Sequence, residues 1–492
     1  MKLILGVAAS LALAASPLPL PGDRAAAGGR HRVEPAGPTQ SRPPPRRCKG
    51  VHIRPGMTIQ SAIDAHPEGV TFCIHRGTYR LTEPLQPKTG QRFIGVRRPI
   101  VSGARILSSF VRREPYWVAG GQTQEDSTNP QGVCRPTTYT GCQYAEGVFL
   151  GDRNLWQVTS LEELVPGSFY FDYAADEIYL ADDPGGHTVE ASVVSHAFAS
   201  WPAKRVVLRG LVIEKFATPA KGSAVGGWAA RNWLIEKNEV RWNHGIGICV
   251  GRGTEVRGNR VHDQGQMGVC GGGGRGIVFE NNVVTHNNTE GFEWGWEAGG
   301  SKFIGSKGLL VRGNRFSHNV GTGLWTDTGN SGTRYIGNRI EHNAGAGIYH
   351  ESSSSAVIRD NVIIGNGTGA GGWDRAGILI GTSTDVEIFD NVVKKNAGGI
   401  FAKQHGASPL ISGLDVHDNV IVMCMGSTGL EVGQGIEADA VYSGKRNRFE
   451  RNTYLVGADQ TTWWRWRQEA RTRAEWRQFG NDTKGRFGTT KC

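Results

Sequence analysis

A repeated pattern of apolar and polar positions runs through residues 230–455. In each repeat, one asparagine has an apolar residue three positions before it and another two positions after it. This anchor pattern occurs nine times, at Asn238, Asn259, Asn282, Asn314, Asn338, Asn361, Asn391, Asn419 and Asn452. The shortest units are 21 to 24 residues long, and longer units carry insertions. A repeat of this length predicts a solenoid of stacked coils.

The spacing inside each unit indicates what the coils are made of. A second asparagine follows five residues after six of the anchors, usually before a glycine and a short apolar pattern with a period of two. Such short alternating runs favour β-strands over helices, and asparagine and glycine suit turns that pass through left-handed conformations. We therefore expect an all-β chain in which stacked coils place the anchor asparagines in a continuous side-chain ladder.

Three segments outside the repeats extend this prediction by resemblance. The sequence "RPGMTIQSAIDAHPEGVTFCIHRGTYRL" (54–81) resembles the N-terminal entry of right-handed parallel β-helix proteins of the pectate-lyase-like class, in which a short amphipathic helix caps the first coils. The segment "RTRAEWRQFGND" (471–482) is similar to the helical tail of exported carbohydrate-active members. Residues 142–192 break the coil pattern and resemble a β subdomain inserted in some bacterial members. The resemblance implies a right-handed parallel β-helix that acts on carbohydrates.

The predicted organisation has six parts. They are a signal peptide at 1–27, a Pro/Arg-rich linker at 28–47, an N-terminal cap with the first coils at 48–141, an inserted β subdomain at 142–200, the β-helix at 201–455 and a C-terminal cap at 456–492. The signal peptide rests on Lys2 followed by about 13 apolar residues, a run too short to span a bilayer. We expect an exported, extracellular monomer without a membrane span.

Charge and cysteine content refine this picture. The chain has 55 Lys and Arg against 45 Asp and Glu, but the excess of ten lies equally in residues 24–47 and 461–492, so the body between them is neutral. A neutral body argues against nucleic acid as a partner. Eight cysteines in an exported chain predict disulfides. The expected pairs are Cys134 with Cys142, Cys48 with Cys73, Cys424 with Cys492, and Cys249 with Cys270, which the repeat places one rung apart.

Candidate chemistry comes from counting along each coil from its glycine. Alternation places the first residue after the glycine inside, and the second and fourth outside. The second positions give an outer column of Glu293, Trp325, Tyr349, Leu379 and Phe401, and the fourth positions give Asp327, Glu351 and Lys403. Trp325 and Tyr349 would then stack on sugar rings, beside a pair of carboxylates on adjacent rungs. Asp327 and Glu351 are therefore the predicted catalytic residues, because neighbouring carboxylates can act as acid/base and nucleophile.

Insertions next to these coils supply further candidates for substrate binding. One contains Glu293 and Trp294, and the other contains Trp373, Asp374 and Arg375. We expect them to wall a groove beside the carboxylates, because loops on one face of a solenoid often carry binding.

Three functions remain open from the sequence. The leading one is a polysaccharide hydrolase; the second is a lyase in which the carboxylates bind Ca²⁺ and Lys403 or Lys302 acts as base; the third is a non-catalytic protein that binds glycans or has a structural role. The catalytic signatures of polygalacturonases, chondroitinase-like lyases and mannuronan epimerases do not occur in the chain, so the resemblance assigns no particular reaction. No CxxC, HExxH or P-loop motif is present either, so a dedicated zinc or nucleotide site is not expected.

Overall fold

The computed structural model describes residues 48–125, 132–135, 141–369, 375–406, 409–433, 436 and 438–492. The chain divides into the units Met1–Arg47 and Cys48–Cys492, and the described helices and strands all belong to the second. The predicted signal peptide and linker, residues 1–27 and 28–47, lie outside the described residues. No helix in the described part of the chain has the length and apolar character needed to cross a membrane.

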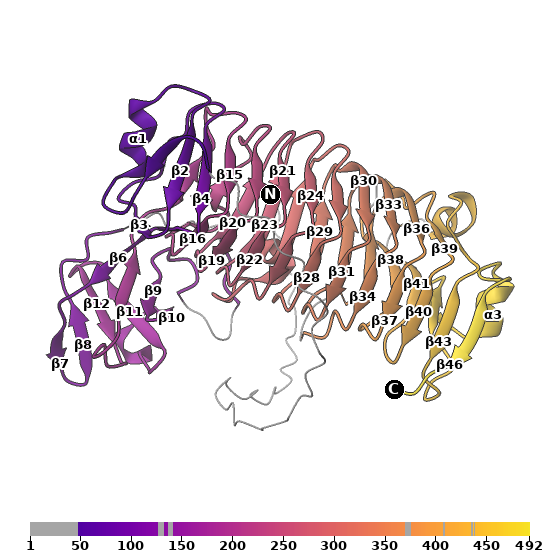
Figure 1. The fold of residues 1–492 in the computed structure, drawn as a ribbon. Helices are drawn as coiled ribbons and strands as arrows, with labels where there is room; N and C mark the ends of the chain where they lie inside the picture. Colours follow the sequence, from indigo (N-terminus) through magenta and orange to yellow (C-terminus); the bar gives the residue numbers. More distant parts are fainter. Residues whose placement is uncertain are drawn as a thin grey trace, which may run out of the picture. The chain divides into compact units, whose positions relative to one another are not determined.

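Three long sheets form the walls of the coil stack within the described residues (Figure 1). The first sheet contains β1 (Val51–Ile53), β2 (Thr71–His75), β4 (Arg92–Val96), β15 (Val207–Arg209), β18 (Leu234–Glu236), β21 (Glu255–Arg257), β24 (Val278–Glu280), β27 (Leu310–Arg312), β30 (Ser331–Ile336), β33 (Ser354–Arg359), β36 (Thr384–Phe389), β39 (Asp415–His417) and β42 (Arg448–Glu450). The second contains β3 (Thr78–Arg80), β5 (Ile100–Ser102), β16 (Val212–Glu214), β19 (Glu239–Arg241), β22 (Arg260–His262), β25 (Val283–Thr285), β28 (Arg315–Ser317), β31 (Arg339–Glu341), β34 (Val362–Ile364), β37 (Val392–Lys394), β40 (Val420–Met423), β43 (Thr453–Val456) and β46 (Arg486–Thr489). The third contains β14 (Phe198–Ala199), β17 (Ser223–Gly226), β20 (Ile246–Val250), β23 (Met267–Gly272), β26 (Gly299–Ile304), β29 (Leu324–Asp327), β32 (Ile348–Glu351), β35 (Ile378–Gly381), β38 (Ile400–Gln404), β41 (Thr428–Val432), β44 (Trp464–Trp466) and β45 (Glu469–Arg471).

Successive coils pair in parallel along all three walls. In the first sheet, for example, β30 pairs with β33 and β33 with β36, so each coil adds one strand. At the end of the third sheet β44 and β45 pair antiparallel. The coils direct mostly apolar side chains inward, and these side chains form a continuous core from Ile53 to Trp476. The predicted parallel β-helix is confirmed.

The anchor asparagines form the predicted ladder. Asn314 shows the repeating unit: its Nδ2 donates to the Phe279 carbonyl at 2.8 Å and to Asn338 Oδ1 at 3.1 Å, while its backbone N donates to the same Oδ1 at 3.0 Å. A second ladder contains Asn243, Gln264, Asn287, Asn319, Asn343, Asn366 and Asn396. The ladders satisfy buried backbone groups at the turns, where the sheets cannot reach them.

A separate sheet is inserted into the early coils. Its strand order is β6 (Ala104–Leu107), β13 (Val189–Ser192), β9 (Val148–Leu150), β10 (Arg153–Val158), β11 (Ser168–Asp172), β12 (Glu177–Leu180), β8 (Tyr116–Ala119) and β7 (Val111–Arg113). This inserted sheet begins before the boundary placed at residue 142, because β6 to β8 already belong to it. Their short runs resemble coil strands in sequence, and only their pairing partners separate them from the coils.

Helices cover the two ends of the core and one insertion. They are α1 (Ile59–Ala65), α2 (Trp294–Glu297) and α3 (Arg473–Gln478), with single helical turns at Leu161–Glu163 and Ala440–Gly444. The first asparagine ladder ends at Asp482 beyond α3, where Asp482 Oδ1 accepts from Asn452 and Oδ2 accepts from Tyr454 and Trp476. The last coil is thus closed by hydrogen bonds as well as by apolar packing.

All four predicted disulfides are confirmed. They join Cys48 to Cys73, Cys134 to Cys142, Cys249 to Cys270, and Cys424 to Cys492. The Cys249–Cys270 pair joins adjacent rungs of the third sheet, as the register of β20 and β23 requires.

Candidate active site on the third sheet

The predicted carboxylates lie at the ends of two neighbouring strands of the third sheet. Asp327 ends β29 and Glu351 ends β32, and the two strands pair with Trp325 opposite Tyr349. Adjacent parallel strands are about 4.8 Å apart. The two side chains are 19% and 15% exposed, so both carboxylates are open to solvent on one side.

Asp327 is held by a lysine from the preceding coil. Lys302 Nζ lies 3.0 Å from Asp327 Oδ2, and Thr328 Oγ1 donates to Oδ1 at 2.8 Å. The lysine also donates to the Trp296 carbonyl at 2.9 Å and lies 3.8 Å from the centre of the Trp325 ring. Its side chain is only 7% exposed. The ammonium therefore neutralises Asp327 and has little freedom to act elsewhere.

Glu351 has a different set of partners. Trp325 Nε1 donates to Glu351 Oε2 at 3.0 Å, and His405 Nε2 lies 3.3 Å from Oε1. His405 follows β38, and a third of its side chain is exposed. The carboxylate is thus fixed by an indole on one side and faces an ionisable imidazole on the other.

The interior beneath the carboxylates is polar but uncharged. His350 is fully buried between the Thr326 hydroxyl at 2.8 Å and the Tyr335 hydroxyl at 2.9 Å. Burial lowers the pKa of His350 to about 3, so its ring is neutral at physiological pH. Burial also raises the pKa of Tyr335. These groups support the strands from inside and do not reach the outer face.

The predicted stacking column is buried. Trp325 is 4% and Tyr349 is 1% exposed, and their rings stack on each other with centres 5.3 Å apart. They pack with Leu379 and two alanines into a small cluster outside the main core. These two rings cannot bind a sugar by stacking, because neighbouring rungs are close enough for the rings to cover one another. Trp325 instead contributes its N–H to Glu351.

The strand pairing next to the α2 insertion shows that the position predicted for Glu293 is wrong. Lys302, and not Glu293, occupies the outer column beside Trp325, because the coil continues from Gly300 and not from Gly291. Glu293 caps α2 by accepting from the backbone N of Gly295 at 3.0 Å. The insertion contains two glycines in similar sequence contexts, and the spacing alone does not distinguish them.

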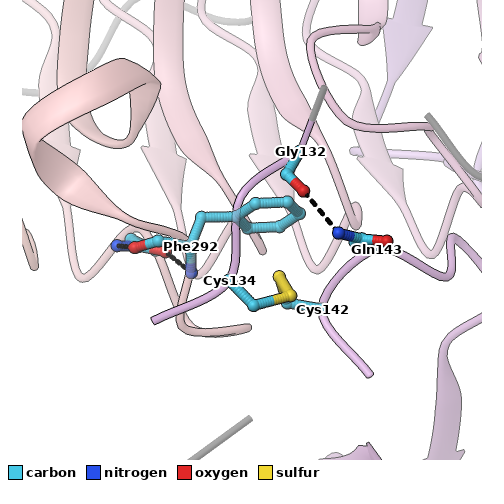
Figure 2. The surroundings of a disulfide bond; sticks show 6 residues. Gly132, Cys134, Cys142, Gln143 and Phe292 are labelled. Atoms are coloured by element: carbon cyan, nitrogen blue, oxygen red, sulfur yellow. Dashed lines mark hydrogen bonds between the residues drawn. A yellow bond between two sulfur atoms is a disulfide. The ribbon is translucent and has the colours of Figure 1, made fainter. Parts of the chain in front are cut away.

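Trp294 lies in a small apolar cluster next to a disulfide. It is 5% exposed and packs with Phe292 against the Cys134–Cys142 disulfide. Figure 2 shows this disulfide next to the Phe292 ring, with Gln143 donating to the Gly132 carbonyl at 2.9 Å. The loop from the inserted sheet therefore pins the α2 insertion onto the coils.

The remaining predicted binding residues have mixed outcomes. Trp373 and Asp374 lie outside the described residues. Arg375 donates from Nε to the Gly367 carbonyl at 3.1 Å, which ties it to its own loop. Lys403 lies on β38 in register with Gly381 and Glu431, on the same outer column as Glu351.

Three tryptophans on this face are exposed; Trp296 lies in the insertion that was expected to wall the groove, whereas Trp201 and Trp228 were not predicted. Trp201, Trp228 and Trp296 are 70%, 58% and 55% exposed. Trp201 and Trp228 line a cavity of about 610 Å³ that also contacts Lys221. Trp228 lines a second cavity of about 270 Å³ together with Lys302. The Lys221 ammonium lies 5.3 Å from the Trp296 ring centre. The rings and cavities lie in the coils just before Asp327, over the N-terminal half of the third sheet.

Comparison with known proteins agrees with this architecture. Residues 223–375 match the family described as "Right handed beta helix region". The chain is a right-handed parallel β-helix protein. Residues 350–478 also match the family described as "Periplasmic copper-binding protein (NosD)". No curated protein matches the chain significantly.

Solved structures resemble this β-helix at low sequence identity. "The complex structure of XylC with xylose" matches at a TM-score of 0.57 and 13% identity, covering 89% of this chain and 82% of the other. A structure titled "Glycoside hydrolase" matches at 0.52 and 12%, covering 75% and 90%. The A-module of mannuronan C-5 epimerase AlgE6 from Azotobacter vinelandii matches at 0.51 and 16%, covering 88% and 94%. Likeness at this identity establishes the shared fold.

Three residues near the candidate site, Trp201, Trp228 and His405, could not be predicted from the sequence pattern. Trp201 and Trp228 precede the register that the anchor asparagines define most clearly, and His405 lies beyond a strand end, where alternation no longer fixes direction. Among the described residues, no group of three or more His, Cys, Asp or Glu side chains is arranged to hold a metal ion.

Proposed function

We propose that this protein is an exported glycoside hydrolase that cleaves a polysaccharide bound along the outer face of the third sheet. The observation that carries the proposal is the pair formed by Asp327 and Glu351 on adjacent rungs, next to a face that exposes three tryptophans. Indole rings bind the C–H faces of pyranoses, and two carboxylates are the usual catalytic groups of glycoside hydrolysis. Structural neighbours titled as a glycoside hydrolase and as a complex with xylose support the same class.

The different partners of the two carboxylates suggest their roles. Asp327 is paired with Lys302, so we assign it as the carboxylate that attacks the anomeric carbon and forms a glycosyl ester. The side-chain partners of Glu351 are an indole N–H and the imidazole of His405, which is charged only if protonated. Among the described residues Glu351 therefore has no permanent cation beside it, and we assign it as the acid that protonates the departing glycosidic oxygen. Glu351 then takes a proton from the water that cleaves the ester. A rung spacing of about 4.8 Å is near the 5–5.5 Å carboxyl separation of retaining enzymes, which favours retention of configuration.

The lyase alternative has less support from this arrangement. In that reaction the carboxylates would bind Ca²⁺, but the Lys302 ammonium already lies 3.0 Å from Asp327 and would repel a second cation there. The same contacts occupy Lys302, which was one of the two candidate bases. Lys403 is the remaining candidate, two rungs beyond Glu351.

The disulfides favour a location outside the cytoplasm. All eight cysteines are paired, and such disulfides persist in oxidising compartments. We therefore propose that the protein acts in the periplasm or outside the cell, where polysaccharides are available.

The test is a survey of polysaccharides with two readouts. The protein is incubated with xylan, arabinan and β-glucan, and with polygalacturonate and alginate, with and without Ca²⁺. We expect new reducing ends without unsaturated uronate absorbance. Asp327→Asn combined with Glu351→Gln should reduce the rate at least about 100-fold, since acid/base catalysis alone contributes about 10²- to 10⁴-fold.

A matched control separates catalysis from general loss of charge. Glu387→Gln removes a carboxylate that is half exposed on the first sheet, and it should leave the rate unchanged. Ca²⁺-dependent unsaturation would instead show a lyase. Binding without any product, unaffected by the double substitution, would show a non-catalytic glycan-binding protein.

A further inference from the structure

A second column of side chains lies at the turn that joins the second sheet to the third in each coil. Trp242, Asp263, His286, His318 and His342 occupy the same position in successive turns, immediately before the second amide ladder. All five have positive φ angles, between 52° and 56°. This left-handed conformation is uncommon for residues other than glycine, and Asn, Asp and His adopt it more readily than other side chains. The turn nevertheless presents aromatic rings in four of the five positions.

The histidine rings of this turn column stack on one another. The rings of His286 and His318 stack in parallel with centres 5.1 Å apart, and His318 lies 5.3 Å from His342. His286 and His318 are exposed to solvent. Burial of one side and the neighbouring imidazoles lower the pKa of His318, so this ring is neutral at physiological pH. The stacked row presents ring edges with hydrogen-bonding nitrogens to solvent, because neighbouring rings cover one another's faces.

The inserted sheet faces this column across a cleft. Strand β10 contributes Asn154 and Trp156 to a cavity of about 420 Å³, and the coils contribute Trp242, His286 and His318. Figure 1 shows β10, an inner strand of the inserted sheet, on the side of that sheet towards the coils. The volume lies in the range of small-molecule sites. The cleft lies at the turn that precedes the strands of the third sheet, whereas Asp327 and Glu351 lie at the opposite ends of two of those strands. The cleft is therefore a separate site.

One polar group of the cleft, the Asn154 side chain, makes only part of its possible hydrogen bonds within the protein. Asn154 Nδ2 donates to Glu290 Oε1 at 2.6 Å, whereas Asn154 Oδ1 is buried and accepts no hydrogen bond from any described residue. Burial raises the pKa of Glu290 to about 7, so its carboxyl carries a proton for much of the time at neutral pH. Asp263, Asn287, Asn288 and Thr289 add polar groups to the lining of the cleft, whereas Glu290 lines an adjoining cavity that shares Asn154.

We propose that this cleft is a second carbohydrate site, which binds an uncharged pyranose segment between the inserted sheet and the turn column. The indole rings of the lining match the apolar faces of a pyranose, and its hydroxyls are matched by the amide, hydroxyl and carboxyl groups and by the imidazole edges of the turn column. None of the described residues that line the cleft is Lys or Arg, and the Arg241 guanidinium, 4.1 Å from the centre of the Trp242 ring, is already paired with Glu214, so the lining fits an uncharged sugar better than a uronate. The choice of a carbohydrate as ligand rests on the proposed function.

The test measures how many oligosaccharides bind one chain. The catalytically silenced protein, carrying Asp327→Asn and Glu351→Gln, is titrated by calorimetry with xylohexaose and with cellohexaose. We expect two sites for at least one of them. Trp156→Ala should remove one site, or weaken it at least tenfold, and leave the other unchanged.

Two further variants keep the test decisive. His318→Ala changes an exposed ring on the opposite wall, so it should weaken the same site without affecting folding, as thermal unfolding would verify. Trp201→Ala is the matched control and should weaken only the third-sheet site. The proposal is overturned if neither sugar binds, or if Trp156→Ala and His318→Ala both leave affinity and stoichiometry unchanged.

The same variants distinguish this proposal from the proposed function. In the otherwise unaltered enzyme, Trp156→Ala should reduce binding to the insoluble polymer and leave the rate on a soluble hexasaccharide within twofold. Absence of hydrolysis by the unaltered protein would refute the hydrolase proposal, but the cleft would still be tested by the number of binding sites.

Discussion

Removing one rung of the asparagine ladder tests how much the ladder stabilises the coils. Asn338 is 1% exposed and lies near the middle of the first ladder. Its Oδ1 accepts from the backbone N and Nδ2 of Asn314 at 3.0 and 3.1 Å, and its Nδ2 donates to the Val311 carbonyl at 2.9 Å and to Asn361 Oδ1 at 3.0 Å. Asn338→Ala removes all four hydrogen bonds.

The size of the effect depends on which partners stay satisfied. Asn361 Oδ1 still accepts from the backbone N of residue 338 at 2.9 Å, and Asn314 Nδ2 still donates to the Phe279 carbonyl. The backbone N of Asn314 loses its acceptor inside the protein. A buried unsatisfied donor costs about 1–3 kcal/mol, and each remaining lost bond about 0.5–1.5 kcal/mol net. With one unsatisfied donor and three other lost bonds, we expect the free energy of unfolding to fall by about 2.5–7.5 kcal/mol.

Urea denaturation followed by tryptophan fluorescence measures this change, with circular dichroism as a second probe. Arg334→Ala, at an exposed position of the same coil, is the control and should change stability by less than about 0.5 kcal/mol. A loss below about 1 kcal/mol for Asn338→Ala, with an unchanged denaturant slope, would show that water replaces the amide at little cost. The ladder would then set the register of the coils without stabilising them.

Three further predictions concern the two faces. Trp296→Ala should raise KM for the cleaved polysaccharide at least tenfold and leave kcat within twofold, because the ring is exposed beside the carboxylates. A fall in kcat alone would argue against a binding role. Glu290→Gln should stabilise the protein by about 1–3 kcal/mol at pH 8 and have little effect at pH 4.5, as measured by denaturation at both values. Because the pKa of Glu290 is raised, the native state keeps this proton between pH 4.5 and about 7, whereas the unfolded chain releases it. The unaltered protein is therefore destabilised as pH rises through that window, and the glutamine variant, which does not titrate, is not. Equal effects at both pH values would refute this account. Replacing Cys134 and Cys142 by serine should lower the Tm by several degrees and weaken polysaccharide binding, because the disulfide pins the insertion that carries Trp296, whereas an unchanged KM would show that α2 holds its position without the disulfide.

The repeat made the fold predictable. The anchor asparagines must align for their amides to bond, so the sequence spacing fixes the coil register from Asn238 to Asn452. The same register gave the Cys249–Cys270 disulfide and the adjacency of Asp327 and Glu351. These conclusions need only the period of the repeat and the alternation of side chains along a strand.

Positions outside that register were not predictable in the same way. The α2 insertion contains Gly291 and Gly300, and only the pairing of β26 shows that Lys302 takes the column position expected for Glu293. His405 and the turn histidines lie beyond strand ends, where direction depends on the turn. Contacts of the inserted sheet join residues more than one hundred positions apart, as between Asn154 and Glu290, and no local pattern encodes them.

Rung spacing also explains why a run of outer aromatic residues is a poor guide to a sugar-binding surface. At about 4.8 Å, rings on neighbouring rungs stack on each other, as Trp325 and Tyr349 do, and their faces are no longer available. A ring stays accessible where its neighbour is small. Trp228 illustrates this, because a methyl group added at Gly272 would come within 3.2 Å of its ring. In a parallel β-helix, an isolated aromatic residue beside a glycine is therefore a better candidate for stacking on a sugar than a continuous aromatic column.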